Sequence, residues 1–475
     1  MSYKYQATQD GPNKYVLDKV GDMRCPVVAF LSPSLYEASD ENLWQDAVVS
    51  ASMPGAIGMY LMPDTHGGYT LPVGGVLVTS DTIIQAGSGY DISCGVIYLR
   101  VPGLFADRIV DWDTRMRWVR EVERRVATGN HSNLPPLMRA AKTKTLRDVL
   151  RYGAKALGVS ADLCERHYIE IDDSIFNEDT LFRRVMPSVP LIETAQQQLG
   201  SVGGGNHFIE MQVDEKDGSV WLMIHCGSRG YGFDLADAYF KKGAEFRGLP
   251  FNRRHESWLR LDEPLGREFW EYHNSAANYA SANRHTIVDG VREATQAVFG
   301  CDVERYFEIS HNLVQQETVR LPDGSMVKGF VHRKGATRAF PAGHPDMVGT
   351  VWEKTGHPCL IPGSMMAGAA ILFPLEGAWE SGCSVNHGSG RMLPRGKAKQ
   401  DLAAIHDEID HEMRTVKRTL GGVEVVGIAC NTERTPLDEC GHAYKDLDAV
   451  LDVLVQNGIA RIDRRLFPVA NLKGA

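Results

Sequence analysis

The sequence predicts an α+β protein with one large domain, in which a core of strands and glycine turns carries a helical insertion. Residues 27–100 and 303–400 contain short apolar, β-branched runs separated by Gly, Pro and Asp, which is typical of β-strands. Residues 104–200 are more charged and carry apolar residues at helical spacing. Chemically suggestive turns occur on both sides of this segment. We therefore expect a single domain over 1–475, with a mostly helical insertion at 104–200.

The individual elements are predicted from apolar periodicity and from turn residues. The runs IGMYLMP, VGGVLVTS and GVIYLRV predict strands within residues 27–100. Residues 201–235 return to strand and turn, and short strands are expected near the C-terminal end. The spacing of apolar residues predicts helices at Thr114–Val126, Leu137–Leu157, Gly266–Phe299 and Asp401–Leu420.

The composition is that of a globular protein with enough apolar material for a large core. The chain has 475 residues, of which 43% are hydrophobic and 23% are charged. Its net charge of −9 argues against broad electrostatic binding to nucleic acid, although a local basic groove is compatible with it. Basic stretches are RMRWVREVERR, KTKTLRDVLRYGAK, VHRKGATR and RMLPRGKAK, of which we interpret the first two mainly as solvated helix faces.

The sequence also limits the cellular context. The first residues contain no apolar segment of the kind found in signal peptides. The most apolar window, MMAGAAILF, is too short to cross a bilayer. Nine scattered cysteines give no disulfide framework, which is typical of a reducing compartment. We therefore expect a cytoplasmic protein that has no membrane partner.

Several potential metal ligands lie in turns rich in small residues. The turns read GSGYDISCG, GGGNHFIE, MIHCGSRG and EISHNLVQ. Imidazole, thiolate and carboxylate groups together select a first-row divalent metal, and small neighbours allow the backbone to approach a ligand closely. Each residue alone is equally consistent with a structural core position. Together they predict one metal site, formed by Asp91, Cys94, His207, His225 and His311.

The local context of these residues adds detail. Asp91 and Cys94 follow a strand-like stretch, and His225 ends the strand VWLMI. His311 precedes Asn312 at a predicted change from strand to helix. The turn after His225 contains Arg229, whose guanidinium is suited to phosphate oxygens and whose neighbouring backbone N–H groups can form an anion nest.

His387 lies in a different kind of turn, NHGSGR, between a strand-rich region and a basic stretch. A neutral imidazole can attack phosphorus and form a phosphoramidate. The N–H groups of Gly388 and Gly390 can stabilise the charge that develops. Asp64 can orient the imidazole through a carboxylate–imidazole hydrogen bond. The alternative is that His387 is a further metal ligand. The residues alone thus indicate a metal-dependent enzyme acting on phosphates, with a histidine as the candidate nucleophile.

A longer series of motifs resembles the RtcB family of RNA ligases. It comprises MPDTHGGYTLPVGG, GYDISCG, LGSVGGGNHFIE, MIHCGSRG, SHNLVQQE, VHRKGATRAFP, IPGSM, NHGSGR and AYKDLD, with Lys-Gly near the end. The motifs occur in the family's order from about residue 60 onward. They are weak only in the helical insertion.

The resemblance implies a ligase that uses GTP and two Mn²⁺ ions. Such enzymes join an RNA 3′-phosphate, or a 2′,3′-cyclic phosphate after its hydrolysis, to a 5′-hydroxyl in tRNA splicing or RNA repair. His387 matches the guanylated histidine, with Asp64 beside it and Arg229 near the phosphates. The residues that we assigned to the metals match the family's ligands, with Cys94 as the bridge. The residues expected to bind the nucleotide are Asn206, Glu210, Asn312, Ser364, His387, Gly388, Gly390, Tyr444 and Lys473. Some relatives require an activating partner, so an archease-like activator is a further expectation.

The chain departs from the family pattern at a few positions. Met366 replaces the usual glycine after IPGSM, and Ala369 replaces a serine that helps to read the base. Val385-Asn386 precedes His387, where a small or cysteine-containing pair is expected. These changes leave room for altered substrates, such as DNA ends. Two other functions stay open: a metal-dependent cyclic phosphodiesterase without ligation, and a non-catalytic protein that binds RNA ends.

Overall fold

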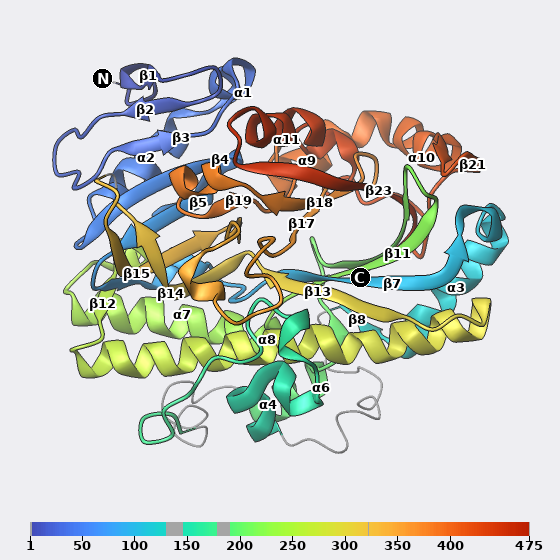
Figure 1. Cartoon of the computed structure of the whole chain (residues 1–475), viewed down its shortest axis with the longest axis horizontal. Helices are drawn as coiled ribbons and strands as arrows, with labels where there is room; N and C mark the ends of the chain where they lie inside the picture. The colour runs from blue at the N-terminus through green and yellow to red at the C-terminus, as the bar shows by residue number, and fades with distance from the viewer. Residues whose placement is uncertain (1, 130–145, 178–190, 322, 475) are drawn as a thin grey trace.

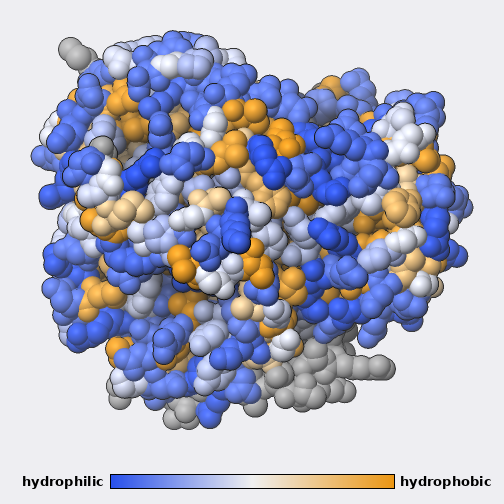
Figure 2. Space-filling view, in the orientation of Figure 1, coloured by the Kyte–Doolittle hydropathy of each residue, from blue (hydrophilic) through white to orange (hydrophobic). Residues whose placement is uncertain are grey.

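Two large β-sheets form the core of the molecule, and helices cover them (Figure 1). This computed structural model describes residues 2–129, 146–177, 191–321 and 323–474. The mixture of helix and sheet confirms the predicted α+β class. No helix in these ranges combines the length and apolar character needed to cross a membrane. On the face shown in Figure 2, hydrophilic residues predominate and hydrophobic ones form small, separate patches.

The first sheet has seven strands in the order β1-β2-β3-β4-β5-β15-β14. Neighbouring strands are antiparallel except for the parallel pair β3 and β4. The strands are β1 (Thr8–Gln9), β2 (Tyr15–Leu17), β3 (Val27–Ala29), β4 (Ala56–Tyr69), β5 (Leu71–Thr79), β14 (Asn312–Arg320) and β15 (Met326–Lys334).

The second sheet has the strand order β13-β7-β11-β10-β23-β18-β17, and β22 lies parallel to β23. Alternate side chains of its central strands are buried against helices, and these apolar residues form the largest core cluster. The strands are β7 (Gly95–Phe105), β10 (Phe208–Asp214), β11 (Ser219–Cys226), β13 (Glu304–Ser310), β17 (Cys359–Pro362), β18 (Ala369–Pro374), β22 (Ala429–Cys430) and β23 (Ala460–Lys473).

Short two-stranded pairs complete the β-structure at the edges of the large sheets. The pair β16–β19 matters most for the site, because β19 leads directly into His387. The short strands are β6 (Thr82–Ile84), β8 (Ala127–Thr128), β9 (Ser201–Val202), β12 (Trp258–Arg260), β16 (Ala336–Arg338), β19 (Ser384–Asn386), β20 (Lys417–Leu420) and β21 (Val423–Val426).

The longest helix, α8 (Pro264–Phe299), crosses the lower part of the molecule, with α7 (Arg229–Phe246) beside it (Figure 1). Proline at the first turn and Gly300 in the left-handed conformation after the last turn delimit α8, as helix-start and helix-stop signals predict. Its residues Ile287, Val288 and Val291 are buried in the main core. The predicted helix at Gly266–Phe299 is thus confirmed.

The described residues of the segment predicted as an insertion contain the helices α3 (Trp112–Arg125), α4 (Leu146–Tyr152) and α6 (Leu191–Gln198). Figure 1 shows α4 and α6 on the outer side of α8. By contrast, α3 buries Trp118, Val119 and Val122 in the main core. The start of the predicted insertion is therefore an integral part of the core. Of the helix predicted at Leu137–Leu157, residues 137–145 lie outside the described ranges, and α4 is followed by a 3-10 helix at Gly153–Leu157.

Several local predictions were wrong. Residues 27–100 also contain α1 (Pro33–Ala38) and α2 (Glu41–Ala51), whose capping residues Ser32 and Asp40 were visible in the sequence. The helix predicted at Asp401–Leu420 is split into the end of α9 (Arg395–Asp401), a 3-10 turn and α10 (His406–Thr415), and its last residues form β20. The C-terminal region contains α11 (Leu447–Gln456) and one long strand, β23, instead of only short strands.

A buried guanidinium joins four segments of the fold. Arg284 of α8 is 1% exposed. Its Nε donates to Glu308 Oε1 of β13 at 2.7 Å, and its Nη1 donates to the carbonyl oxygens of Ser93 and Cys226 at 2.6 and 2.8 Å. It thus holds α8 against β13, the end of β11 and the turn before β7. Removing one partner of such a buried pair leaves an uncompensated charge.

We predict that Arg284→Met lowers the free energy of unfolding by about 3–5 kcal/mol, because Glu308 is left buried without its counter-ion. Denaturant unfolding measures the effect. The matched control is Arg292→Met on the same helix, whose partly exposed ion pairs with Asp289 and Asp302 contribute less than about 1 kcal/mol. Equal losses in the two variants would refute the central role of Arg284.

Candidate active site

Strand register brings the predicted metal ligands together at one end of the neighbouring strands β13, β7, β11 and β10 of the second sheet. His225 on β11 lies opposite Val96 on β7 and Phe208 on β10. Gly95, which follows Cys94, lies opposite Ser310, which precedes His311. His207 immediately precedes β10. Residues from four distant stretches of the chain therefore meet at one place because the antiparallel register aligns the ends of their strands.

The five predicted ligands form one buried cluster. Sγ of Cys94 lies 3.3 Å from Nε2 of His207 and 3.2 Å from Nε2 of His225. The Nε2 atoms of His225 and His311 are 3.3 Å apart. Asp91 Oδ2 lies 2.9 Å from His207 Nε2. The atoms form two overlapping groups of potential ligands, Cys94–His225–His311 and Asp91–Cys94–His207, which share the thiol.

The electrostatics of this cluster fit a bound cation. Burial and the neighbouring His207 lower the pKa of His225, and burial together with His225 lowers that of His311, so both rings are neutral. Burial and Asp91 raise the pKa of the Cys94 thiol to about 12. Three Nε2 atoms and a thiol thus face one another around a small space. Imidazole and sulfur donors suit Zn²⁺ and other first-row transition-metal ions, and a coordinated cation converts the thiol to thiolate.

Asp91 and His207 form an ion pair at one side of the same cluster. Burial alone would raise the pKa of Asp91, but its contacts with His207 lower that pKa to about 2. Burial likewise opposes protonation of His207, yet nearby Cys226, Cys94 and Asp91 raise its pKa well above the ordinary value. The carboxylate is therefore ionised and can serve as a ligand. It also accepts the backbone N–H of Ser228 at 3.1 Å, which fixes its orientation.

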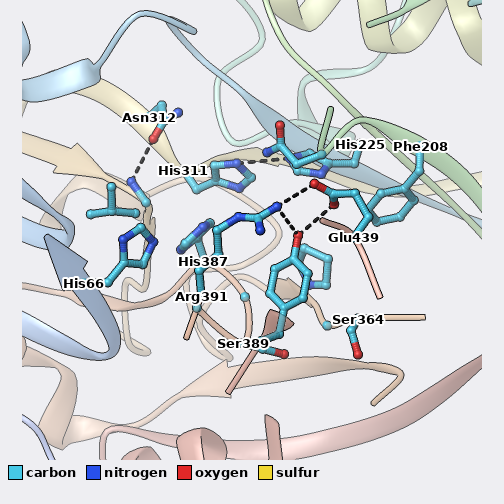
Figure 3. Close-up of a pocket in the computed structure, with 18 of the residues that line it drawn as sticks. His66, Phe208, His225, His311, Asn312, Ser364, His387, Ser389, Arg391 and Glu439 are labelled. Carbon is cyan, nitrogen blue, oxygen red and sulfur yellow. Dashed lines mark hydrogen bonds and ion pairs between the residues drawn. The ribbon is translucent and has the colours of Figure 1, made fainter. Parts of the chain in front are cut away.

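A cavity of about 380 Å³ adjoins this cluster (Figure 3). His225 and His311 belong both to its wall and to the metal-ligand cluster. The volume lies in the range of small-ligand sites. Predicted residues that line it are Asn206, Glu210, His225, His311, Asn312, Ser364, His387, Gly388, Gly390, Tyr444 and Lys473. The structure thus brings the predicted nucleotide-binding residues together with the predicted nucleophile.

His387 is held by a carboxylate from the other sheet. Its Nδ1 lies 2.6 Å from Oδ2 of Asp64, which is fully buried in β4. The same oxygen accepts the backbone N–H groups of His387 and Gly388 at 3.1 and 3.2 Å. The imidazole is 20% exposed and lies beside His311, with ring centroids 5.1 Å apart. With Nδ1 turned toward Asp64, Nε2 is the ring nitrogen left to react.

The turn after His387 requires glycine at one position. Gly390 has φ of +73°, and a Cβ there would lie 2.1 Å from the carbonyl oxygen of Asp64. Any other residue would therefore push the turn away from β4. Asn386, one of the departures from the family pattern, is fully buried and donates to the carbonyl oxygen of Gly388 at 2.6 Å. It thus supports the same turn.

The expected base-binding residues form a buried polar wall. The oxygens of Glu210 accept from Gln212 Nε2 at 2.7 Å and from Asn471 Nδ2 at 2.6 Å. Burial raises the pKa of Glu210. Lys473 ends β23 opposite Phe208, and its ammonium lies 5.0 Å above the Phe208 ring. These groups are held in place by strand pairing, which preorganises them for a planar polar ligand.

The other predicted nucleotide-binding residues have local structural roles as well. Asn312 Oδ1 accepts the backbone N–H of Gly335 at 2.7 Å. Ser364 Oγ accepts the backbone N–H of Ala367 at 3.1 Å in the turn after β17. Asn206 Oδ1 accepts a hydrogen bond from the guanidinium Nη2 of Arg395 at 3.3 Å. All three side chains remain part of the cavity wall.

Glu439, which the sequence reasoning missed, organises the charged side of the cavity. It accepts from Tyr444 Oη at 2.7 Å and from Arg391 Nη2 at 2.6 Å, as the dashed lines in Figure 3 show. Lys473 Nζ is 3.4 Å away, and Arg395 lies at the same distance. No motif marks Glu439, but Arg391 and Arg395 both belong to the basic stretch RMLPRGKAK. In the sequence, this basic stretch was the signal that could have indicated a charged side of the cavity.

Two residues lie elsewhere than predicted. Arg229 does not line the cavity: it is buried, and it donates to Ser201 Oγ at 3.2 Å and to the carbonyl oxygen of Gly129 at 2.7 Å. Its guanidinium is thus used to hold backbone behind His207. Ala369 is fully buried between Leu466 and Pro362 on neighbouring strands and also lies outside the lining.

One predicted local structure around the ligands was wrong. His311 marks a passage from β13 to β14, so the chain continues as strand where a helix was predicted. Asp91 and Cys94 follow strand β6, as expected, with a 3-10 helix at Gln85–Ser88 in between, and they precede strand β7.

A second group of potential ligands is engaged by arginines. Cys164, His285 and Glu308 are buried within ligand distance of one another. However, Arg305 Nε donates to His285 Nδ1 at 3.2 Å, and Arg284 is paired with Glu308. Arg284 already balances the carboxylate of Glu308, and Arg305 occupies Nδ1 of His285, so this cluster has a structural role in the described part of the chain.

Comparison with known proteins gives one consistent result. The family model described as tRNA-splicing ligase RtcB matches residues 46–474. The tRNA-splicing ligase RtcB of Thermococcus kodakarensis is 32% identical over 95% of this chain and 95% of its own length. The RNA-splicing ligase RtcB of Mycobacterium tuberculosis is 30% identical over 89% and 99%, respectively. RNA-splicing ligase RtcB homolog 1 of Entamoeba dispar is 29% identical over 90% and 80%. The chain therefore belongs to the RtcB family of RNA-splicing ligases.

Proposed function

We propose that this protein is a GTP- and Mn²⁺-dependent ligase that joins an RNA 3′-phosphate, or a 2′,3′-cyclic phosphate after its hydrolysis, to a 5′-hydroxyl. The observation that carries this proposal is the position of His387. Its imidazole is oriented by a buried carboxylate, and it faces a cavity whose wall continues into the metal-ligand cluster through His311. A nucleophile, a nucleotide-sized cavity and a metal centre thus share one space.

The metal centre would consist of two Mn²⁺ ions. The donor set fits them, since it combines a shared thiol, three imidazole nitrogens and an ionised carboxylate. Asp91, Cys94 and His207 would hold one ion, and Cys94, His225 and His311 would hold the other. When bound, the ions supply charge neutralisation for phosphate oxygens.

In the first step, GTP is a substrate and His387 is the nucleophile. Nε2 attacks the α-phosphorus, a nitrogen–phosphorus bond forms, and the bond to the bridging oxygen of pyrophosphate breaks. Asp64 holds Nδ1–H and stabilises the positive charge that develops on the ring. Arg391 and Arg395, both near the cavity, are suited to accompany the departing pyrophosphate charge.

In the next two steps, GMP moves to the RNA and then leaves. An oxygen of the RNA 3′-phosphate attacks the phosphorus on His387, so that the nitrogen–phosphorus bond breaks and a diphosphate linkage forms. The 5′-hydroxyl oxygen then attacks the 3′-phosphate, its proton is lost, and GMP departs as the new phosphodiester forms. The chain contributes mainly position and charge, which is the usual logic of phosphoryl transfer.

Guanine recognition would rely on Glu210 and Lys473. An ionised carboxylate can accept from the N1–H and the amino group of guanine, which adenine does not offer. The Phe208 ring under Lys473 closes one side of this wall. Since Ala369 lies outside the cavity lining, we expect the replacement of the family's serine by alanine at this position to change no direct contact with the base.

We predict that His387→Ala abolishes a covalent GMP adduct while the protein retains its metals, because five other residues form the metal cluster. Labelled GTP with Mn²⁺ and acid-labile protein labelling measure the adduct, and elemental analysis measures the metals. His66→Ala, which removes a second imidazole from the same cavity, is the control and keeps the adduct. Loss of most metal in His387→Ala would make His387 a ligand and end the nucleophile hypothesis.

For Cys94→Ser we predict the opposite pattern: loss of metal, and therefore loss of both adduct and ligation. Loss of an outer-shell partner alone weakens metal binding roughly 10- to 100-fold, so loss of the shared thiol should cost more. Cys25→Ser is the matched control, since this buried thiol packs in a separate core cluster and belongs to none of the ligand groups. Near-normal ligation by Cys94→Ser in limiting Mn²⁺ would make Cys94 a core residue only.

A third prediction concerns the base. Glu210→Gln should reduce the preference for GTP over ATP, because an amide matches the two guanine donors poorly. An unpaired buried polar group costs about 1–3 kcal/mol, or roughly 5- to 150-fold in selectivity. Adduct formation from GTP, ATP and inosine triphosphate measures it, and Ala369→Ser serves as a control that leaves the preference unchanged. If the unmodified protein uses ATP and GTP equally, the role of Glu210 must be withdrawn.

A further inference from the structure

An aromatic and cationic surface continues outward from the cavity. Tyr69 and Tyr90 line the cavity wall. The ring of Tyr90 stacks on Phe233 of α7, with centroids 4.9 Å apart and planes 24° apart. Phe233 is 51% exposed, although it is a large apolar side chain. Aromatic faces therefore pass without a break from the wall of the reaction cavity to solvent.

The neighbouring 3-10 helix η8 (Phe251–Glu256) extends this surface. Tyr90 Oη lies 2.9 Å from Nε2 of His255, and Arg254 donates to the same oxygen at 3.4 Å. The guanidinium of Arg254 lies 4.4 Å from the centre of the Phe251 ring, which is 65% exposed. Arg254 thus lies against one exposed ring, Phe251, and is joined through Tyr90 to the other, Phe233.

The charge on Arg254 is available to a ligand. Among the residues that the structure describes, its guanidinium contacts the Phe251 carbonyl and the Tyr90 hydroxyl, and it forms no ion pair with a carboxylate. Its Nε is buried without a partner. The adjacent Arg253 differs, because Glu256 binds its guanidinium.

The other titratable groups nearby do not cancel this charge. Burial and Arg254 lower the pKa of His255 to about 4, so the ring is neutral near pH 7. Asp237 of α7 is paired with Lys241. Burial and Asp237 raise the pKa of Asp234. Lys334 lines the cavity wall with its nitrogen 3.2 Å from the centre of the Tyr69 ring, but burial lowers its pKa to about 7, so Arg254 is the permanent cation of this surface.

We propose that this surface, formed by Tyr90, Phe233, Phe251 and Arg254, binds the unpaired nucleotides next to the reacting RNA end. Bases stack on exposed aromatic rings whatever their sequence, and an arginine between such rings suits the connecting phosphate. Single-stranded RNA is recognised mainly in this way. The proposal rests on the proposed ligase function, because it concerns the nucleic acid that must reach His387.

The arrangement favours a nucleic-acid strand over a protein partner. The surface begins at Tyr90 in the wall of the cavity where the phosphate chemistry would occur, so the nucleotides next to an RNA end held in that cavity can reach it. Tyr90 covers one face of Phe233 and leaves the other face to solvent. A flat aromatic face backed by a second ring, with a cation beside it, matches a base and its phosphate.

Equilibrium binding and ligation kinetics test the proposal on the full-length protein. The probe is a single-stranded RNA with a 3′-phosphate, and a second version lacks the bases of the two terminal nucleotides. We expect Phe233→Ala and Phe251→Ala each to weaken binding of the complete RNA roughly 5- to 150-fold, the range for loss of one stacked base. The abasic RNA should bind the unmodified protein weakly and lose little more in these variants, since the same contact is already absent.

Matched controls separate this surface from general effects. Arg254→Gln should raise the KM for RNA and leave kcat unchanged. Arg253→Gln, which makes the same change in net charge, should leave the KM unchanged as well. Phe105→Ala removes an exposed phenylalanine from β7 and should also have no effect. GMP adduct formation, which needs no RNA, should be equal in all of these proteins.

The outcomes distinguish this proposal from the ligase function on which it rests. If the unmodified protein forms no adduct and no ligated product, the ligase proposal fails, while RNA binding still tests the surface. If adduct and ligation are normal but both phenylalanine variants bind complete RNA within twofold of the unmodified protein, the surface proposal is overturned. A change in oligomeric state without a change in RNA binding would also overturn it, and would make the surface a protein interface.

Discussion

The buried guanidinium of Arg284 is the interaction on which the candidate site depends. It donates to Glu308, to the carbonyl and hydroxyl oxygens of Ser93, and to the Cys226 carbonyl. Ser93 precedes Cys94, Cys226 follows His225, and Glu308 lies on the strand that leads to His311. One side chain of α8 thus fixes the three backbone segments that carry one complete group of potential metal ligands. The long helix α8 therefore holds the ends of these strands in fixed positions relative to one another.

This alignment forces uncharged donors together at a cost. The Nε2 atoms of His225 and His311 face each other at 3.3 Å, and both Nδ1 atoms are buried without partners. One ring can donate its Nε2–H to the other in this arrangement, and a cation that binds both Nε2 atoms would take the place of that hydrogen bond. On the other side of the cavity, the carboxylate of Glu439 holds three cationic side chains in place, those of Lys473, Arg391 and Arg395. The cavity is thus preorganised for a ligand that carries several negative charges.

The sequence predicted the ligands better than it predicted their surroundings. Short glycine turns identify Cys94 and His387 because close backbone approach requires small residues there, as the Gly390–Asp64 contact demonstrates. Arg229 lies outside the cavity lining, and its sequence context did not show this because a guanidinium that binds a backbone carbonyl has the same local context as one that binds phosphate. Glu439 lies outside every motif, and only tertiary packing brings it to Lys473. Local patterns thus report close approach, whereas charge balance depends on contacts between distant residues.

The same reasoning applies to the helical segment at 104–200. Glu165, from its irregular part, accepts the backbone N–H and the hydroxyl of Ser310 at 2.8 and 2.7 Å, directly before His311. Its carboxylate is also paired with Arg338 of β16, which pairs with the strand leading to His387. A buried carboxylate outside the recognised motifs therefore supports both the candidate metal cluster and the candidate nucleophile. The part of this segment around Glu165 therefore belongs to the framework of the candidate site, because removing it would leave two strands of the site without their shared anchor.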